Sequence, residues 1–223
     1  MVYRQFWLGF SLFWLVFTPL LAEEPDGSAT VGEVLLTKGV KSVNITLNGE
    51  SFTIQRNQTP GNTITDLYSS TTVGSLQPMS LAPGIETIGE LELIDYLQKA
   101  QKNSNIMLVD TRTPFWFARM RIPGSINVPY SLFKGELNAD ETVEKFFNVK
   151  VDDKGQLDFS QAKTIIGYCN GYFCGQTPSM FTREAFSLLK IGYPPEKLKY
   201  YRGGMQAWTS LGLTVVGDEV LSQ

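Results

Sequence analysis

The two cysteines are the residues best suited to chemistry in this sequence, and they lie five positions apart, at Cys169 and Cys174. Cys169 follows an apolar stretch, residues 163–168, that is typical of a buried strand, and a helix is expected from Pro178, because proline is favoured in the first turn of a helix. A loop that curls back before a helix directs several backbone N–H groups into one small space, and the helix dipole adds positive potential there. Both effects favour a thiolate, whose pKa in such places is about 3.5–7.5 instead of about 8.5. The sequence therefore predicts that Cys169 is a nucleophile.

The rest of the loop between Cys169 and Pro178 supplies the candidate substrate contacts. These residues are Asn170, Gly171, Tyr172, Phe173 and Gly175. Aromatic side chains in a loop shape a substrate entrance, dock a partner, or simply pack on a neighbouring loop, and the sequence leaves all three open.

Histidine is absent from the chain, which narrows the chemistry further. The absence excludes Ser-His-Asp and Cys-His catalysis, and two cysteines alone offer too few ligands for most zinc sites. A thiolate needs no general base, and we expect neither a metal nor a cofactor. The net charge of −3, with scattered Lys and Arg, gives no footprint for nucleic acid.

Strands and helices alternate from about residue 85 onward. The pattern predicts strands at 105–109, 126–128, 163–168 and 197–201, and helices at 90–102, 114–120, 141–148, 178–190 and 205–211. Such alternation predicts an α/β fold, with a parallel sheet covered by helices on both faces. Sites in these sheets form outside the carboxyl ends of the strands, which is where Cys169 lies.

Three more motifs, in order along the chain, resemble the rhodanese (thiosulfate sulfurtransferase-like) family. The motifs are Leu108-Val109-Asp110-Thr111-Arg112, similar to the family's D-x-R strand end; residues 121–129 (RIPGSINVP), similar to H-I-P-G-A-x-N-x-P; and residues 203–208 (GGMQAW) followed by Gly212-Leu213, similar to G-G-x-x-x-W. Cys169 stands at the position of the family's active-site loop. The resemblance covers about residues 88–216.

The resemblance implies a five-stranded parallel sheet and a Cys169 that cycles between thiol and persulfide. The partners implied are a small sulfur donor, such as thiosulfate, and a thiol acceptor. Asp110 and Arg112 are implied to be structural, as a buried charged pair that needs good hydrogen bonding.

The sequence also departs from the family pattern. Arg121 stands where the family often has histidine, and the basic residue that many members carry near the loop's end is absent. Arg112, Arg119 and Arg121 are the expected sources of positive charge at the pocket rim, whereas Arg183 is expected to lie too far along its helix. The phosphatase branch of this fold needs an arginine within the loop to hold phosphate, so we exclude it.

Three functions remain open for the cysteine pair. Cys169 transfers sulfur, with Cys174 a bystander or a resolving thiol; or the two form a redox couple exchanged with a thioredoxin-type partner; or a structural disulfide supports a non-catalytic binding module. Five-residue separation permits a disulfide if the Cα atoms approach within about 4.4–6.8 Å. Sulfur transfer is the favoured interpretation, because the loop stabilises a thiolate.

The N-terminal residues predict export. Arg4 precedes an apolar stretch, residues 6–21, and Ala22 is followed by a polar, acidic segment, the layout of a signal peptide spanning residues 1–22. The stretch is short for a membrane span, and only an uncleaved segment would act as an anchor. We therefore expect a periplasmic or secreted protein, in which disulfides are favoured.

An extension and a tail are expected to flank the α/β domain. Residues 23–87 form the extension, with a hairpin turning at Asn48-Gly49 between alternating apolar runs that begin near residue 32, followed by an irregular connection. Residues 217–223 form the C-terminal tail.

Overall fold

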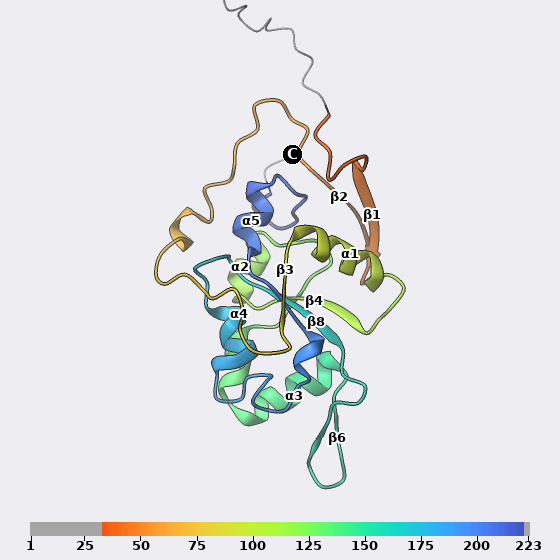
Figure 1. Ribbon diagram of the computed structural model, residues 1–223, viewed down its shortest axis with the longest axis vertical. Helices are drawn as coiled ribbons and strands as arrows, with labels where there is room; N and C mark the ends of the chain where they lie inside the picture. Colours follow the sequence, from red (N-terminus) through yellow and green to blue (C-terminus); the bar gives the residue numbers. More distant parts are fainter. Residues whose placement is uncertain (1–32, 221–223) are drawn as a thin grey trace, which may run out of the picture. The chain divides into compact units, whose positions relative to one another are not determined.

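The computed structural model describes residues 33–220, so the expected signal peptide lies outside the described residues. A five-stranded sheet, in the order β3-β9-β8-β4-β5, forms its centre (Figure 1). The strands are β3 (Glu86–Ile88), β4 (Ile106–Asp110), β5 (Ile126–Asn127), β8 (Thr164–Tyr168) and β9 (Leu198–Tyr201). All neighbouring pairs are parallel, so the predicted α/β fold is confirmed. β8 lies in the middle, which places Cys169 at the centre of the sheet's carboxyl edge.

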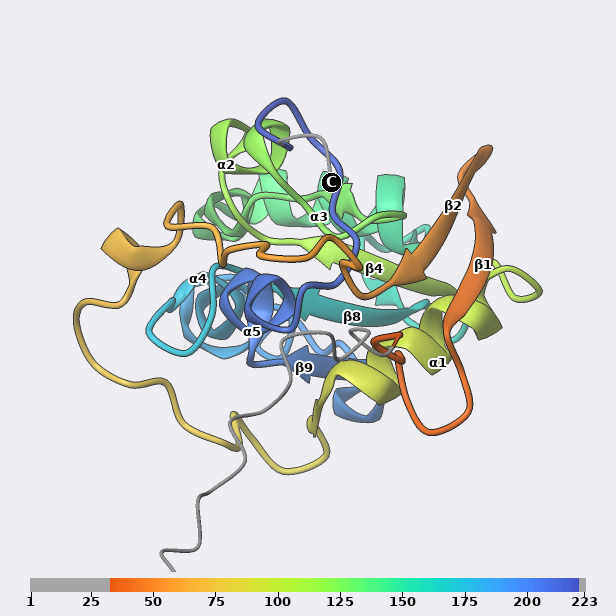
Figure 2. The same cartoon turned by 90° about the horizontal axis from the view of Figure 1, so that it is seen from above.

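Helices cover both faces of this sheet (Figure 2). Successive strand side chains point to opposite faces. Ile166 belongs to the core cluster that includes α1 (Glu90–Ala100) and α5 (Gly204–Ser210). Ile165 belongs to the opposite cluster, with α3 (Glu136–Phe147) and the chain that follows Cys169. This division explains why the two central strands, β4 and β8, carry consecutive apolar residues.

The predicted hairpin is present and packs against the first of these cores. β1 (Ser42–Leu47) and β2 (Glu50–Gln55) pair antiparallel. Asn48 and Gly49 have φ of +52° and +81°, the left-handed conformations that a two-residue type I′ turn requires. The apolar run that begins near residue 32 is not a strand, because only an isolated bridge between Thr37 and Val40 forms there.

The helix predicted over 178–190 is wrong beyond its first residues. α4 (Gln176–Pro178) continues into a π-turn, η3 (Ser179–Arg183), and the chain then leaves the helix at Glu184, whose ψ is 161°. The backbone N–H of Leu188 donates to the carbonyl of Met180 at 2.9 Å, which folds the chain back on η3 and buries Leu188. Tertiary burial therefore outweighs the local helical preference of this stretch.

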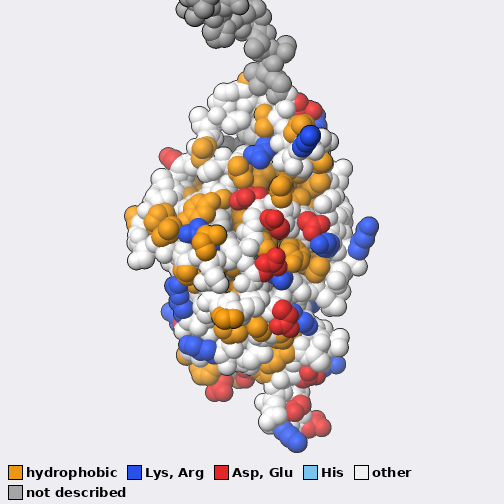
Figure 3. All heavy atoms as spheres, in the orientation of Figure 1, with side chains coloured by type: hydrophobic (Ala, Val, Ile, Leu, Met, Phe, Trp, Pro, Cys, Tyr) orange, Lys and Arg blue, Asp and Glu red, His pale blue; other side chains and the backbone are white. Residues whose placement is uncertain are grey.

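The remaining elements are short. They are η1 (Ser69–Thr71), α2 (Pro114–Arg119), η2 (Tyr130–Lys134), β6 (Lys150–Val151), β7 (Leu157–Asp158) and η4 (Pro195–Lys197). The helix expected at 141–148 begins earlier, as α3. On the face shown in Figure 3, acidic and basic side chains are interspersed. Between residues 33 and 220, no helix combines the length and the apolar character needed to span a membrane.

Candidate active site

The Cys169 loop is held in place by the start of α5. The backbone N–H of Met205 donates to the Cys169 carbonyl at 3.1 Å, and that of Gln206 donates to the Asn170 carbonyl at 2.8 Å. Gly204 has φ +53°, and a Cβ there would lie 2.3 Å from the Cys169 carbonyl oxygen. Only glycine permits this approach, which gives a physical reason for the second glycine of the GGMQAW segment.

Hydrogen bonds around the Cys169 sulfur favour its ionised form. Burial by itself raises the pKa of Cys169, but hydrogen bonds from the Cys174 thiol, from the hydroxyl and backbone N–H of Thr177, and from the N–H of Gly171 outweigh it and lower the pKa from 9.0 to about 7. One contact acts the other way: the Cys174 carbonyl oxygen lies 3.2 Å from Sγ of Cys169 and accepts the proton of the thiol form. Four donors outweigh this single acceptor, so a large part of the sulfur is thiolate near neutral pH.

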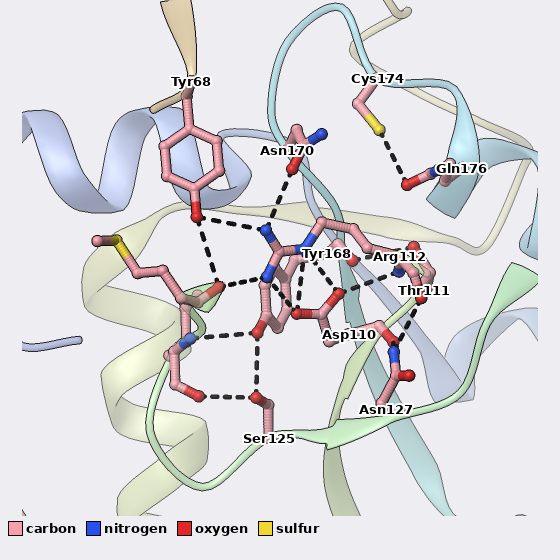
Figure 4. Close-up of polar contacts among 12 residues, drawn as sticks. Tyr68, Asp110, Thr111, Arg112, Ser125, Asn127, Tyr168, Asn170, Cys174 and Gln176 are labelled. Atoms are coloured by element: carbon pink, nitrogen blue, oxygen red, sulfur yellow. Dashed lines mark hydrogen bonds and ion pairs between the residues drawn. The ribbon is translucent and has the colours of Figure 1, made fainter. Parts of the chain in front are cut away.

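Cys174 is the proton donor of the pair. The pKa of Cys174 is raised by its hydrogen bond to Cys169, by burial and by the neighbouring negative charge, so it stays a thiol when Cys169 ionises. Its Sγ also lies 3.5 Å from Oε1 of Gln176 (Figure 4). Both cysteines are free thiols in this structure.

A segment of the N-terminal extension covers the loop. We call residues 72–79 the strap; all are exposed except Gln77, whose side chain is only 8% exposed. The Gln77 N–H donates to the Tyr172 carbonyl at 2.8 Å, and the Gln77 carbonyl accepts from Nε and Nη2 of Arg202 at 3.0 and 2.8 Å. Cys169, at the start of this loop, is 2% exposed. A reagent therefore reaches the sulfur only when the chain around it moves.

Gln206 ties the loop to the same extension from the α5 side. Its Oε1 accepts the N–H of Tyr172 at 3.1 Å, and its Nε2 donates to Oγ1 of Thr71 at 2.9 Å. Gly171 has φ +147°, and a Cβ there would lie 2.3 Å from the same Oε1. The loop is therefore fixed by contacts that only small residues allow.

The aromatic loop residues face a cavity rather than the sulfur. Tyr172 and Phe173 line a space of about 590 Å³ together with Ile64, Tyr68 and Gln206. Cys169 does not line this space. Tyr172 is exposed and Phe173 half-buried where they line this cavity.

Asp110 and Arg112 form the buried ion pair that the resemblance implied. Both side chains are fully buried, with Nη2 of Arg112 2.6 Å from Oδ2 of Asp110 (Figure 4). The guanidinium also donates to the carbonyl of Met120 at 2.7 Å and to Oδ1 of Asn170 at 3.1 Å. Every side of Arg112 is thus occupied by protein. Arg112 positions Asn170 in the loop and is not a charge at the pocket rim.

The other two arginines expected at the rim are also engaged elsewhere. Arg119 pairs with Glu219 at 2.5 Å and lies over the ring of Trp116. Arg121 stacks on Phe117, with 4.7 Å between its Cζ and the ring centre. Arg183, which the sequence predicts to lie too far along its helix, instead reaches the loop: a Cβ built on Gly175 would lie 3.5 Å from its Nη1.

Several residues of the site could not be found from the sequence. Thr177, Gln206 and Gln77 reach the loop through contacts whose partners are set by the fold. Gln206 lies within the GGMQAW segment, but at a position that the G-G-x-x-x-W pattern leaves open. Tyr200, on β9, is fully buried, and its hydroxyl has no hydrogen-bond partner in the described part of the chain. The pKa of Tyr200 is raised by burial and then by the charge of Cys169. Across residues 33–220, no set of three acidic or cysteine side chains is arranged to hold a metal ion.

Comparison with known proteins identifies the family. Residues 93–211, more than half of the chain, match the model of the Rhodanese-like domain. A search of curated proteins finds no match.

Solved structures with similar folds share about a fifth of their residues with this chain. The BH2092 protein from Bacillus halodurans is 21% identical, covering 61% of this chain and 85% of its own, with a TM-score of 0.42. A thiosulfate sulfurtransferase from Pseudomonas aeruginosa is 21% identical, and the match covers 60% of this chain and 20% of the other, with a TM-score of 0.39. An As-Sb reductase from Leishmania major is 21% identical, and the match covers 55% of this chain and 76% of the other, with a TM-score of 0.39. The assignment rests on the family model and on the sheet, since these TM-scores lie below 0.5. With this match and its five-stranded parallel sheet, the chain belongs to the rhodanese-like family.

Proposed function

We propose that the protein is a sulfurtransferase that carries sulfur as a persulfide on Cys169. The observation that carries the proposal is the hydrogen bonding of the Cys169 sulfur, which lowers the pKa of Cys169 to about 7. A thiolate is the nucleophile in sulfur chemistry, and here it forms without a general base. The same N–H and O–H groups can donate to the outer sulfur of a persulfide, which is also an anion.

The loading step balances with thiosulfate as the donor. The thiolate of Cys169 attacks the outer sulfur of thiosulfate; an S–S bond forms to Cys169, and the S–S bond to the sulfonate breaks. Sulfite leaves with the electron pair of the broken bond, and no proton or outside oxidant is needed. In the second step the thiolate of an acceptor attacks the outer sulfur and restores the thiolate of Cys169.

The test is the intact mass of the reduced protein after incubation with thiosulfate. We expect an increase by one sulfur atom that a thiol acceptor removes and that Cys169→Ser abolishes. Cys174→Ser is the matched control, because it changes the neighbouring sulfur and leaves the proposed nucleophile. A protein that gains no sulfur from thiosulfate, inorganic polysulfide or a low-molecular-weight persulfide is not a sulfurtransferase.

A second candidate function is thiol–disulfide exchange by Cys169 and Cys174. The hydrogen bond between the two sulfurs favours it, since it pairs a thiolate with a thiol inside one loop. A thioredoxin-type protein would be the partner of such a couple. A redox titration separates the possibilities: a potential below about −300 mV marks a structural bridge, and a higher one marks an exchangeable couple. A binding module, in turn, requires that both Cys→Ser variants keep full function.

A further inference from the structure

The π-turn after the loop has a consequence for charge at the sulfur. In η3 the N–H of Glu184 donates to the carbonyl of Ser179 at 2.9 Å, a five-residue step that widens the helix. π-turns occur mostly as single turns and frequently at functional sites. Helical side chains point back toward the N-terminus, and a long arginine on the last residue of η3 can therefore reach the loop.

The guanidinium of Arg183 ends beside Gly175, directly next to the peptide that contacts the sulfur. A Cβ on Gly175 would lie 3.5 Å from Nη1 of Arg183 and 3.7 and 3.9 Å from the amide atoms of Gln77. These are ordinary contact distances, so the missing side chain leaves room for one small group between the two. The Cys174 carbonyl, bonded to Gly175, is 3.2 Å from Sγ of Cys169.

One buried polar atom beside this space lacks a partner. Oε1 of Gln77, a residue that is 92% buried, has no hydrogen-bond partner within residues 33–220. A buried polar atom without a partner is costly, and such atoms are rare in folded proteins. Because an amide oxygen only accepts hydrogen bonds, it offers nothing to an anion, and the positive charge beside this space comes from the Arg183 guanidinium.

Among the arginines considered for the site, Arg183 is the one whose guanidinium is not engaged by another described residue. Arg112, Arg119 and Arg121 are engaged with Asp110, Glu219 and Phe117, and Arg202 is fixed on the Gln77 carbonyl. In the described part of the chain, the Arg183 guanidinium has neither an ion pair nor a hydrogen bond, and the residue is exposed.

We propose that Arg183 is a specificity-determining residue that draws anionic reagents, such as oxyanions with a terminal sulfur, to the Cys169 sulfur. The natural ligand named in this inference rests on the proposed function, whereas the experiment that tests the inference does not depend on it. A dianion that approaches a thiolate is repelled, and a fixed positive charge at the entrance offsets that repulsion. Gly175 provides the room and the Arg183 guanidinium the charge.

The experiment compares two alkylating reagents of similar size, the anion iodoacetate and the neutral iodoacetamide, by the rate at which each modifies Cys169 in the full chain. Hydrogen bonds to charged groups are worth a factor of about ten or more, and exposure keeps the effect at the lower end. We expect Arg183→Gln to slow iodoacetate about tenfold and to leave iodoacetamide unchanged. Arg183→Lys should restore most of the rate, and added salt should slow iodoacetate with the unaltered protein but not with Arg183→Gln.

Lys154→Gln, on the turn between β6 and β7, is the control for a loss of one positive charge. An iodoacetate to iodoacetamide ratio that Arg183→Gln leaves unchanged, or that Lys154→Gln lowers equally, overturns the inference. Thiosulfate loading separates this outcome from failure of the proposed function. If thiosulfate loads Arg183→Gln as fast as the unaltered protein, the role of Arg183 is refuted and the sulfurtransferase proposal stands. If the alkylation ratio changes but no persulfide forms, the sulfurtransferase proposal is refuted and the role of Arg183 stands.

Discussion

Replacing Thr177 by valine tests the cause of the low pKa at Cys169. Valine has nearly the same shape, keeps the backbone N–H that donates to the sulfur, and removes only the hydroxyl. A hydrogen bond to a charged group contributes about 1.5–3 kcal/mol, and one pKa unit corresponds to about 1.4 kcal/mol. The pKa of Cys169 should therefore rise by about one to two units, from about 7 to about 8–9.

The assay is the pH dependence of Cys169 alkylation by iodoacetamide, followed by mass spectrometry of the peptide that contains it. The rate should fall as the pH drops through the pKa, because only the thiolate reacts. Thr182→Val is the matched control: it lies on η3, and its hydroxyl donates to the Pro178 carbonyl at 2.9 Å rather than to the sulfur. An unaltered protein with a midpoint near 9, or a Thr177→Val midpoint that stays at about 7, would refute the idea that these donors activate the cysteine.

Three further changes test the supports of the loop. Gly204→Ala adds a Cβ against the loop at a residue with left-handed backbone. Gly155→Ala is its control, because the space around Gly155 is open and only the left-handed backbone costs free energy, about 1–2 kcal/mol or about 2–8 °C in melting temperature. Gly204→Ala should lower the melting temperature at least twice as much as Gly155→Ala, and equal shifts contradict the steric argument. Asp110→Asn leaves Arg112 buried without its partner and should lower the free energy of unfolding by about 3–5 kcal/mol in urea titration, and a loss below 1 kcal/mol contradicts this account. Gln77→Ala thins the strap and should speed alkylation of the sulfur at every pH without moving the midpoint; an unchanged rate means that the strap does not control access.

The sheet could be predicted because its strands carry strong local signals. The apolar run that ends at Tyr168 becomes β8, and Asn48-Gly49 adopts the turn that its two residues favour. The reason is that strand burial and a two-residue turn depend on neighbours in the sequence. The same holds for the placement of Cys169 directly after a central strand.

The environment of the sulfur could not be predicted, because it depends on where the chain returns. Residues 178–190 have a helical composition, yet burial of Leu188 ends the helix after Arg183, and the π-turn turns an arginine expected to be remote into a neighbour of the loop. Gln77 contacts the loop across 96 positions of sequence, through a contact that its side chain makes with the Phe173 carbonyl. No spacing rule connects residues so far apart, and the covering of the site therefore appears only in three dimensions.

The loop is held by residues that precede it and by residues that follow it in the sequence, and this matters while the chain is being synthesised. Gln77 and Arg202, which meet over the loop, are 125 positions apart, and the α5 amides that hold the Cys169 carbonyl lie beyond the cysteine itself. During synthesis the cysteine is made before the segment that secures it, so we expect the thiol of a chain that lacks α5 to be less reactive. Full reactivity of the sulfur is therefore expected only after Gln77, the loop and the start of α5 have come together, so that alkylation of Cys169 would report on that assembly.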